Sequence, residues 1–183
     1  GNIYGIVLKT WATDTNYAKI FNNNGEVVTY EVDDDVWDDV QGDGGLQQAT
    51  ASDTFKFLKF KVDADGVIDT VNSGSKTLPG DPEDTTGDVE AVNTSTSGVL
   101  SESNDYLAID GNKYFFTEDT PIFDLDILET GEVYADGDID DIQLVKWSDI
   151  EDADEGTIYV AVIGSPNRDA DALVVLSGLE DIA

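Results

Sequence analysis

The sequence predicts an all-β protein made of two small β-barrel or β-sandwich modules in tandem, with little helix. Short runs of β-branched and aromatic residues recur along the 183 residues, separated by Gly, Asn and Asp turns. The order of these runs repeats in the second half, and stretches with a helical period are scarce. Short, regularly spaced strands with turn signals between them are typical of small barrels and sandwiches.

The first module is expected over residues 1–73. Its predicted strands cover 3–10, 18–21, 26–32, 54–62 and 67–71. An Asn-Gly step at Asn24-Gly25 predicts a hairpin, since both residues tolerate positive φ. Asp65-Gly66 predicts a second tight turn, between the last two strands.

Residues 74–86 form a predicted linker or long surface loop, because they hold two Pro-containing turns and few apolar residues. The second module is expected over 87–183. Its predicted strands cover 88–92, 106–109, 113–117, 122–125, 142–146, 157–163 and 172–176. One turn of helix is expected after Ser148, which is a residue type that caps helices.

The two predicted modules follow each other closely enough to indicate an internal duplication. Residues 5–11 correspond to 87–93, residues 18–37 to 107–123, and residues 55–71 to 158–176. The correspondence depends on the order of strands and turns, not on identity. Each half has an opening strand, a strand-turn-strand, an acidic corner, a loop and a closing hairpin.

Composition excludes several functions. Forty acidic residues against nine basic ones give a formal charge of −31, so nucleic acid is not an expected partner. The chain contains no His and no Cys, which removes imidazole bases, thiolate nucleophiles and zinc-thiolate sites. The sequence contains no run of 18 apolar residues, so membrane insertion is not expected. Many carboxylates suit a glycosidase, but no spacing selects a pair, so we do not expect an enzyme.

Two acidic corners are candidate cation sites. Asp33, Asp34 and Asp35 crowd the first, and Asp136, Asp138 and Asp140 crowd the second with alternate spacing. Calcium takes six to eight oxygen ligands, which such loops can supply. The second corner is not an EF-hand, since position 12 is Trp147 and not Glu. Two interpretations remain: the corners bind Ca²⁺, or they are acidic loops that are simply solvated.

A cluster of lysines stands out on this acidic chain. Lys56, Lys59 and Lys61 carry a third of the basic charge within six residues. Lysines on an edge strand block unwanted strand addition. Alternatively, the three are assembly contacts for an acidic corner of a neighbouring subunit, and the sequence does not separate the two hypotheses.

Several stretches resemble a known group of proteins. YGIVLKT, GEVVTYEVDDDV and KFKVDADGVIDTV in the first half, with NKYFFTEDTPIFDL and TIYVAVIGSPNRDADALVVLSG in the second, are similar to β-modules of bacterial cell-envelope proteins. In that group the modules follow surface-layer-homology anchors. The resemblance implies an extracellular, cell-surface structural protein without catalysis. The anchor repeats are absent from this sequence, and the 41–52 loop is unusually rich in Gly and Gln.

These observations together predict a structural protein that self-assembles into a surface layer, sheath or filament, with cations screening its charge. The expected partners are further copies of the chain and other cell-envelope components. A calcium-dependent adhesin or a carbohydrate-binding module is the alternative, with exposed Trp residues as a sugar platform. Halophilic adaptation of an unrelated domain would also explain the excess of Asp.

Overall fold

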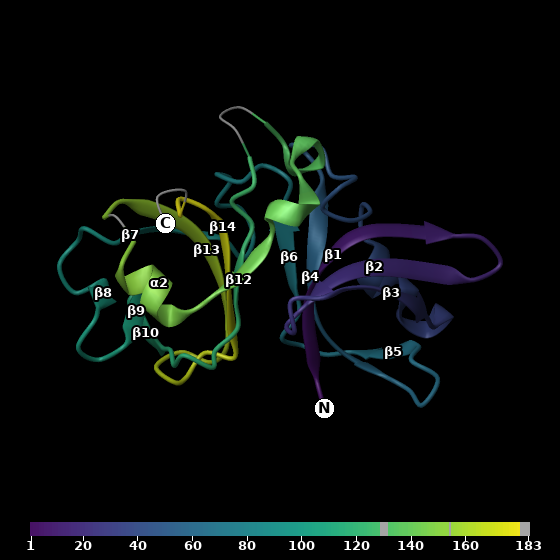
Figure 1. The fold of residues 1–183 in the computed structure, drawn as a ribbon, viewed down its shortest axis with the longest axis horizontal. Helices are drawn as coiled ribbons and strands as arrows, with labels where there is room; N and C mark the ends of the chain where they lie inside the picture. Colours follow the sequence, from purple (N-terminus) through teal and green to yellow (C-terminus); the bar gives the residue numbers. More distant parts are fainter. Residues whose placement is uncertain (129–131, 154, 180–183) are drawn as a thin grey trace. The chain divides into compact units, whose positions relative to one another are not determined.

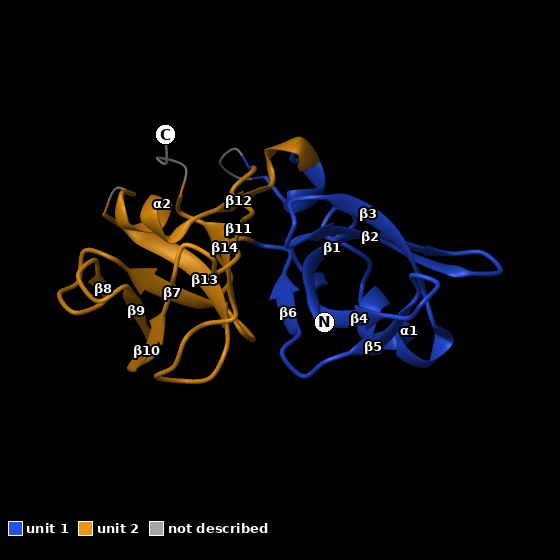
Figure 2. Ribbon diagram, turned by 60° about the horizontal axis from the view of Figure 1, so that its bottom comes forward, with its two compact units in different colours: residues 1–81, 128–137 blue, residues 82–127, 138–183 orange. Residues whose placement is uncertain are grey.

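The computed structural model describes residues 1–128, 132–153 and 155–179 (Figure 1). Strands make up 42% of the structure and helices 11%, which confirms the predicted all-β class. The chain forms two compact units (Figure 2). Unit 1 comprises Gly1–Asp81 and Leu128–Gly137, and unit 2 comprises Pro82–Ile127 and Asp138–Ala183.

Unit 1 contains the first six strands. They are β1 (Ile3–Ala12), β2 (Asn16–Asn22), β3 (Val27–Val32), β4 (Thr54–Val62), β5 (Ile68–Val71) and β6 (Lys76–Pro79). The turn between β2 and β3 forms because the Asn22 side chain accepts hydrogen bonds from the N–H groups of Asn24 and Glu26. Gly25 supplies the positive φ, at 76°.

The pairings in unit 1 close into a ring of five strands. β2 lies antiparallel between β1 and β3, and β4 pairs antiparallel with both β1 and β5. A parallel pairing of β3 with β5, at Val32 and Ile68, completes the ring. The short helices η1 (Asp34–Val36) and α1 (Trp37–Gln41) lie between β3 and β4. The strand order around this ring is β1-β2-β3-β5-β4.

The side chains inside this ring form one hydrophobic cluster. Its buried members are Val7, Ala18, Ile20, Val32, Val40, Leu58, Phe60 and Ile68. Val40 comes from α1 and is completely buried, so the short helix packs onto the cluster. Burial of apolar surface contributes about 25 cal/mol per Å², so this cluster stabilises unit 1.

The Gly- and Gln-rich loop between α1 and β4 lies against β1 as a turn. The N–H groups of Leu46 and Gln47 donate to the carbonyls of Val7 and Leu8, at 2.8 and 2.9 Å. The Gln48 side-chain amide bonds both backbone groups of Thr10, at 3.0 and 3.1 Å. A Cβ on Gly45 would lie 2.1 Å from the Leu8 carbonyl carbon, so only glycine permits this approach.

The predicted linker at 74–86 is partly wrong, because it contains β6. Thr54–Phe57 of β4 pairs antiparallel with β6, and Leu78 is completely buried opposite Phe55. Leu78 and Pro79 are both buried, and their burial with the partner strand suffices for pairing although Lys76 and Thr77 are polar. The boundary between the units falls after Asp81, still within the predicted linker range.

The predicted second module is also corrected at one point, since Leu128–Gly137 belongs to unit 1. Within this segment lies the helical turn η2 (Tyr134–Asp136). The Tyr134 ring is completely buried and meets the Phe55 ring edge-on, with centroids 5.5 Å apart. This aromatic contact explains why the segment joins unit 1.

Unit 2 contains eight strands in two sheets. They are β7 (Glu90–Asn93), β8 (Leu100–Ser101), β9 (Tyr106–Ile109), β10 (Asn112–Phe115), β11 (Ile122–Asp124), β12 (Gln143–Val145), β13 (Thr157–Ile163) and β14 (Ala172–Ser177). The strand order is β12-β11-β14-β13-β7 in the larger sheet and β10-β9-β8 in the smaller. The tight turn between β9 and β10 has positive φ values, 50° at Asp110 and 80° at Gly111.

Three pairings of unit 1 recur in unit 2. The opening strand β7 pairs antiparallel with β13, as β1 does with β4. β13 and β14 form a closing hairpin, as β4 and β5 do. β14 runs parallel to β11, as β5 does to β3, and helical turns separate β11 from β13. The units therefore share a connectivity, while a duplication of the sequence stays a prediction.

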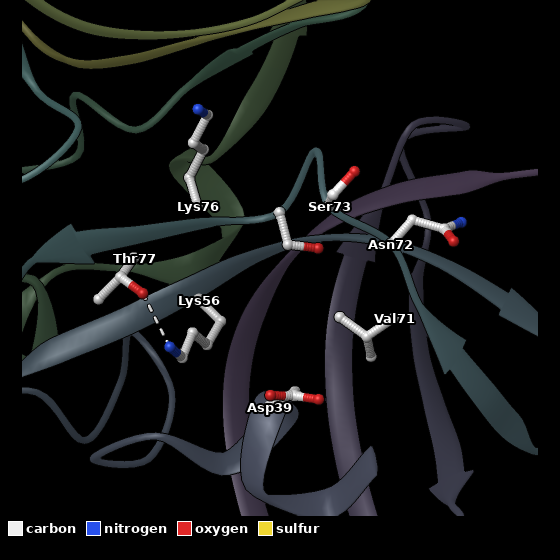
Figure 3. A pocket seen from close by; sticks show the side chains of 8 residues that line it. Asp39, Lys56, Val71, Asn72, Ser73, Lys76 and Thr77 are labelled. Atoms are coloured by element: carbon white, nitrogen blue, oxygen red, sulfur yellow. Dashed lines mark hydrogen bonds between the residues drawn. The ribbon is translucent and has the colours of Figure 1, made fainter.

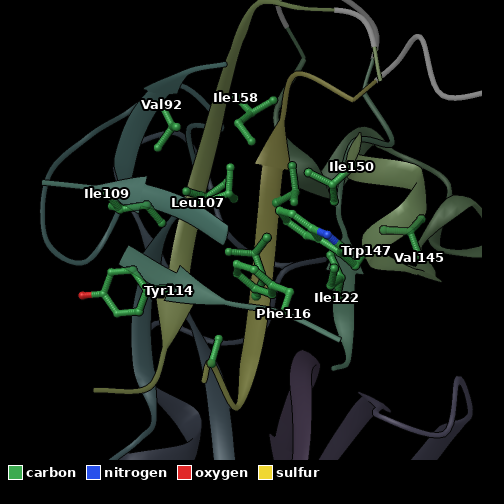
Figure 4. Packing of buried hydrophobic residues seen from close by; sticks show 14 of the residues in the cluster. Val92, Leu107, Ile109, Tyr114, Phe116, Ile122, Val145, Trp147, Ile150 and Ile158 are labelled. Carbon is green, nitrogen blue, oxygen red and sulfur yellow. The ribbon is translucent and has the colours of Figure 1, made fainter. Parts of the chain in front are cut away.

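The core of unit 2 is centred on a stacked pair of rings (Figure 4). Trp147, in α2 (Trp147–Glu151), lies almost parallel to Phe116, with centroids 4.8 Å apart and an interplanar angle of 6°. Its indole N–H donates to the Asp105 carboxylate at 3.0 Å. Helix α2 begins one residue before the predicted Ser148 cap, because the Asp149 carboxylate accepts the Lys146 N–H at 2.8 Å.

Candidate functional site

The first acidic corner is held together by local hydrogen bonds. Asp33 caps η1, and its carboxylate accepts from the Asp35 N–H at 2.9 Å. The Asp34 carboxylate accepts from the Asn16 side-chain amide at 2.7 Å. Asp34 and Asp35 are exposed and Asp33 is half-buried. Two of the three carboxylates therefore stabilise the end of β3 and the start of η1.

The second acidic corner is divided between the two units. Asp136 belongs to unit 1, whereas Asp138 and Asp140 belong to unit 2. Asp138 caps the helical turn η3 (Ile139–Asp141), and its carboxylate accepts from the Asp140 N–H at 3.0 Å. The alternate spacing of these residues thus serves a helix cap in this structure.

Neither corner gathers its carboxylates into a metal cage. Among residues 1–128, 132–153 and 155–179, no three acidic side chains form a group that could hold a metal ion. Calcium needs six to eight oxygens at roughly 2.3–2.6 Å, which these separate carboxylates do not supply by themselves. Calcium binding therefore stays a prediction.

The three lysines of β4 have different surroundings. Lys56 Nζ donates to Thr77 Oγ1 at 2.7 Å, and Lys59 Nζ lies 5.9 Å from the Tyr4 ring centroid. Only Lys61 is fully exposed. β4 is bonded to β1 on one side and to β5 and β6 on the other, so it is not an edge strand at its centre. Edge protection is therefore wrong for Lys59.

Lys56 lines a polar pocket of about 380 Å³ in unit 1 (Figure 3). The pocket lies between α1, β4, and the turn from β5 to β6, with Asp39 facing Lys56 across it. The lining residues are Asp39, Lys56, Val71, Asn72, Ser73, Ser75, Lys76 and Thr77. These groups can both donate and accept hydrogen bonds, which matches hydroxyl-rich ligands more closely than apolar ones.

A second polar feature lies on the outer face of β1 and β2. Lys9 is opposite Lys19, and Trp11 is opposite Tyr17, so two like pairs lie next to each other. The Trp11 and Tyr17 rings stack with centroids 5.5 Å apart and an interplanar angle of 22°. We call these four residues the cationic–aromatic face. Our sequence analysis missed it, although the Asn-Gly turn and the alternation of β2 predict the side on which Tyr17 and Lys19 lie.

A carboxyl pair lies beside Trp147 in unit 2. Burial raises the pKa of Glu151, and a hydrogen bond to Asp105 together with its negative charge adds to the increase. Trp147 donates to the same Asp105 carboxylate. Because Asp105 holds the indole of the buried Trp147, we assign the pair a structural role.

Comparisons with protein-family profiles, with curated proteins and with solved structures found no match. Among the described residues, no helix has both the length and the apolar character needed to cross a membrane.

Proposed function

We propose that this chain is an extracellular structural protein that self-assembles into a surface layer, sheath or filament at the cell surface, and that it catalyses no reaction. The observation that carries the proposal is the recurrence of one strand connectivity in two consecutive units. Modular β-units are suited to forming extended arrays through repeated contacts.

Cations assist this assembly in our proposal. Copies that each carry a formal charge of −31 repel one another, and dissolved ions reduce that repulsion. Exposed carboxylates at the acidic corners, such as Asp35 and Asp140, are the groups where Ca²⁺ would act between copies. Such weak sites would fill at about 0.1–1 mM calcium, whereas a halophilic protein would need molar monovalent salt.

Electron microscopy of the protein with millimolar calcium, and again after chelation, tests the proposal. We expect ordered sheets or filaments with calcium, and shorter or dispersed particles with chelator. Isolated particles under both conditions and at high protein concentration would contradict self-assembly. Melting curves in calcium and in molar sodium chloride separate calcium dependence from adaptation to salt.

The polar pocket of unit 1 favours a second candidate function, a carbohydrate-binding module or calcium-dependent adhesin. Its mixture of carboxylate, ammonium, amide and hydroxyl groups suits sugar hydroxyls. Calorimetric titration with neutral and acidic oligosaccharides tests this candidate. Saturable binding that is lost in Asn72→Ala, with Asn104→Ala as an exposed control outside the pocket, would support the adhesin.

A further inference from the structure

We propose that the cationic–aromatic face is a docking surface for a second copy of this chain, which contacts it through acidic side chains. This inference rests on the self-assembly proposed above and names one contact that builds it. The face consists of Lys9, Trp11, Tyr17 and Lys19 on the outer side of β1 and β2.

The register puts the four side chains outside the core. On β2, Ala18 and Ile20 are buried, while the alternate residues Tyr17 and Lys19 are only half-buried. On β1, Lys9 is exposed and Trp11 half-buried. In both ribbon views β1 and β2 run on together as a hairpin that projects from the rest of unit 1 (Figures 1 and 2). The face is therefore open to a partner.

The pairing of Lys9 with Lys19 is unfavourable for the isolated fold. Like charges directly opposite each other on an antiparallel ladder destabilise it. The chain has nine basic and forty acidic residues, so an acidic cross-strand partner would be far more common by composition. Two lysines placed together fit a surface that receives negative charge from outside.

The neighbouring aromatic pair gives this surface a rigid apolar part. Trp11 and Tyr17 stack on each other, and Lys9 Nζ lies 5.8 Å from the Trp11 ring centroid. Val27, at the far end of the same side of β3, is 47% exposed. Trp and Tyr surrounded by polar groups are typical of the centres of protein interfaces.

Charge complementarity favours another copy as the partner. Exposed acidic side chains are abundant on this chain, and those at the second corner include Asp136, Asp138, Asp140 and Asp141. A contact between the cationic–aromatic face of one copy and an acidic surface of the next joins two different patches. Such a heterologous contact propagates into a ring or an open filament.

A matched pair of charge reversals tests the contact. The test variant is Lys9→Glu/Lys19→Glu, and the control is Lys146→Glu/Arg168→Glu, which makes the same charge change at two exposed residues of unit 2. Sedimentation velocity at about 0.15 M ionic strength with calcium measures association. We expect the test variant to weaken association by about tenfold or more, and the control by less than about threefold. Trp11→Ala should weaken it comparably, and circular dichroism checks that each variant folds.

The other outcomes distinguish failure of the proposed function from failure of the docking face. If the wild type does not associate at all, the proposed function fails. If the wild type associates and both charge-reversal variants weaken it equally, or neither does, the docking face is wrong while self-assembly stands. If a monomeric wild type binds alginate, an anionic polysaccharide, and only the test variant loses that binding, the partner is a glycan and the second copy is excluded.

Discussion

Units 1 and 2 have three pairings in common but complete them differently. In unit 1 the long strand β2 joins β1 to β3, and the five strands close into a ring. In unit 2 the corresponding stretch forms a separate three-stranded sheet, β10-β9-β8. The same pairings thus allow two arrangements over a core. Unit 1 uses the continuous strand β2, and unit 2 uses a small second sheet.

The difference is also seen in how each core is filled. Unit 1 packs aliphatic residues and Phe60 inside its ring, whereas unit 2 depends on the stack of Trp147 on Phe116. This comparison indicates where each unit is most sensitive to mutation.

Trp147→Ala should have the largest effect. Removing a ring that is 2% exposed leaves a cavity, so we expect a loss of about 3–5 kcal/mol in the free energy of unfolding. Hydrogen exchange read by NMR should show loss of protection first in unit 2. Phe60→Ala is the matched variant, with the loss first in unit 1. Equal loss across both units in both variants would contradict separate cores.

Gly45→Ala should disrupt the contact between β1 and the Gly- and Gln-rich loop of unit 1. Its Cβ would meet the backbone of Leu8 and Lys9 at 2.1–2.3 Å, where no flexible side chain can move aside. We expect a loss of about 1–3 kcal/mol, measured by urea unfolding. Gly156→Ala is the control, since its Cβ would meet nothing within 4 Å. A stable Gly45→Ala protein would mean that the 45–48 segment does not lie against β1.

Gln48→Ala, in the same loop beside β1, should lower the free energy of unfolding by less than Gly45→Ala does. The side-chain amide bonds Thr10 twice and accepts from the Gly45 N–H at 2.8 Å. Because Gln48 is exposed, water replaces part of these bonds, and we expect a loss of about 1–2 kcal/mol. Gln47→Ala, which keeps the backbone bond to Leu8, should change the free energy of unfolding less.

Glu151→Gln should give the smallest effect, and one that depends on pH. The pKa of Glu151 is raised above its ordinary value of 4.5, so the folded state binds this proton more tightly than the unfolded state does. The stabilisation is therefore present at low pH and is lost as pH rises above about 4.5 through the raised pKa.

We expect Glu151→Gln to melt at a higher temperature than wild type at pH 7, with the difference disappearing towards pH 4. Thermal melts between pH 4 and pH 7 measure this, with the exposed Glu155→Gln as control. A wild-type protein whose melting temperature exceeds that of the Gln variant at pH 7 would contradict the raised pKa.

The strands were predictable because their patterns are local. Alternation and turn residues gave the class, and strand 106–109 was predicted with its observed bounds. β6 was missed because its pairing depends on β4, a partner distant in sequence, and Leu78 and Pro79 are its only apolar residues. The contact of Tyr134 with Phe55 likewise joins residues far apart along the chain, which no local pattern shows.

The candidate sites were less predictable for the same reason. Alternate aspartates suggested metal ligands, yet Asp33 and Asp138 accept hydrogen bonds from N–H groups two residues ahead, which is a common use of that residue type. The cationic–aromatic face depends on the register between β1 and β2. A bulge between Val7 and Lys9 sets that register, and sequence alternation does not reveal it.

Light scattering after size-exclusion chromatography, over a hundredfold range of wild-type concentration in millimolar calcium, tests self-assembly most directly. We predict a mass that increases with concentration to many times 19.7 kDa. A constant mass of one chain at every concentration, with and without calcium, would contradict it.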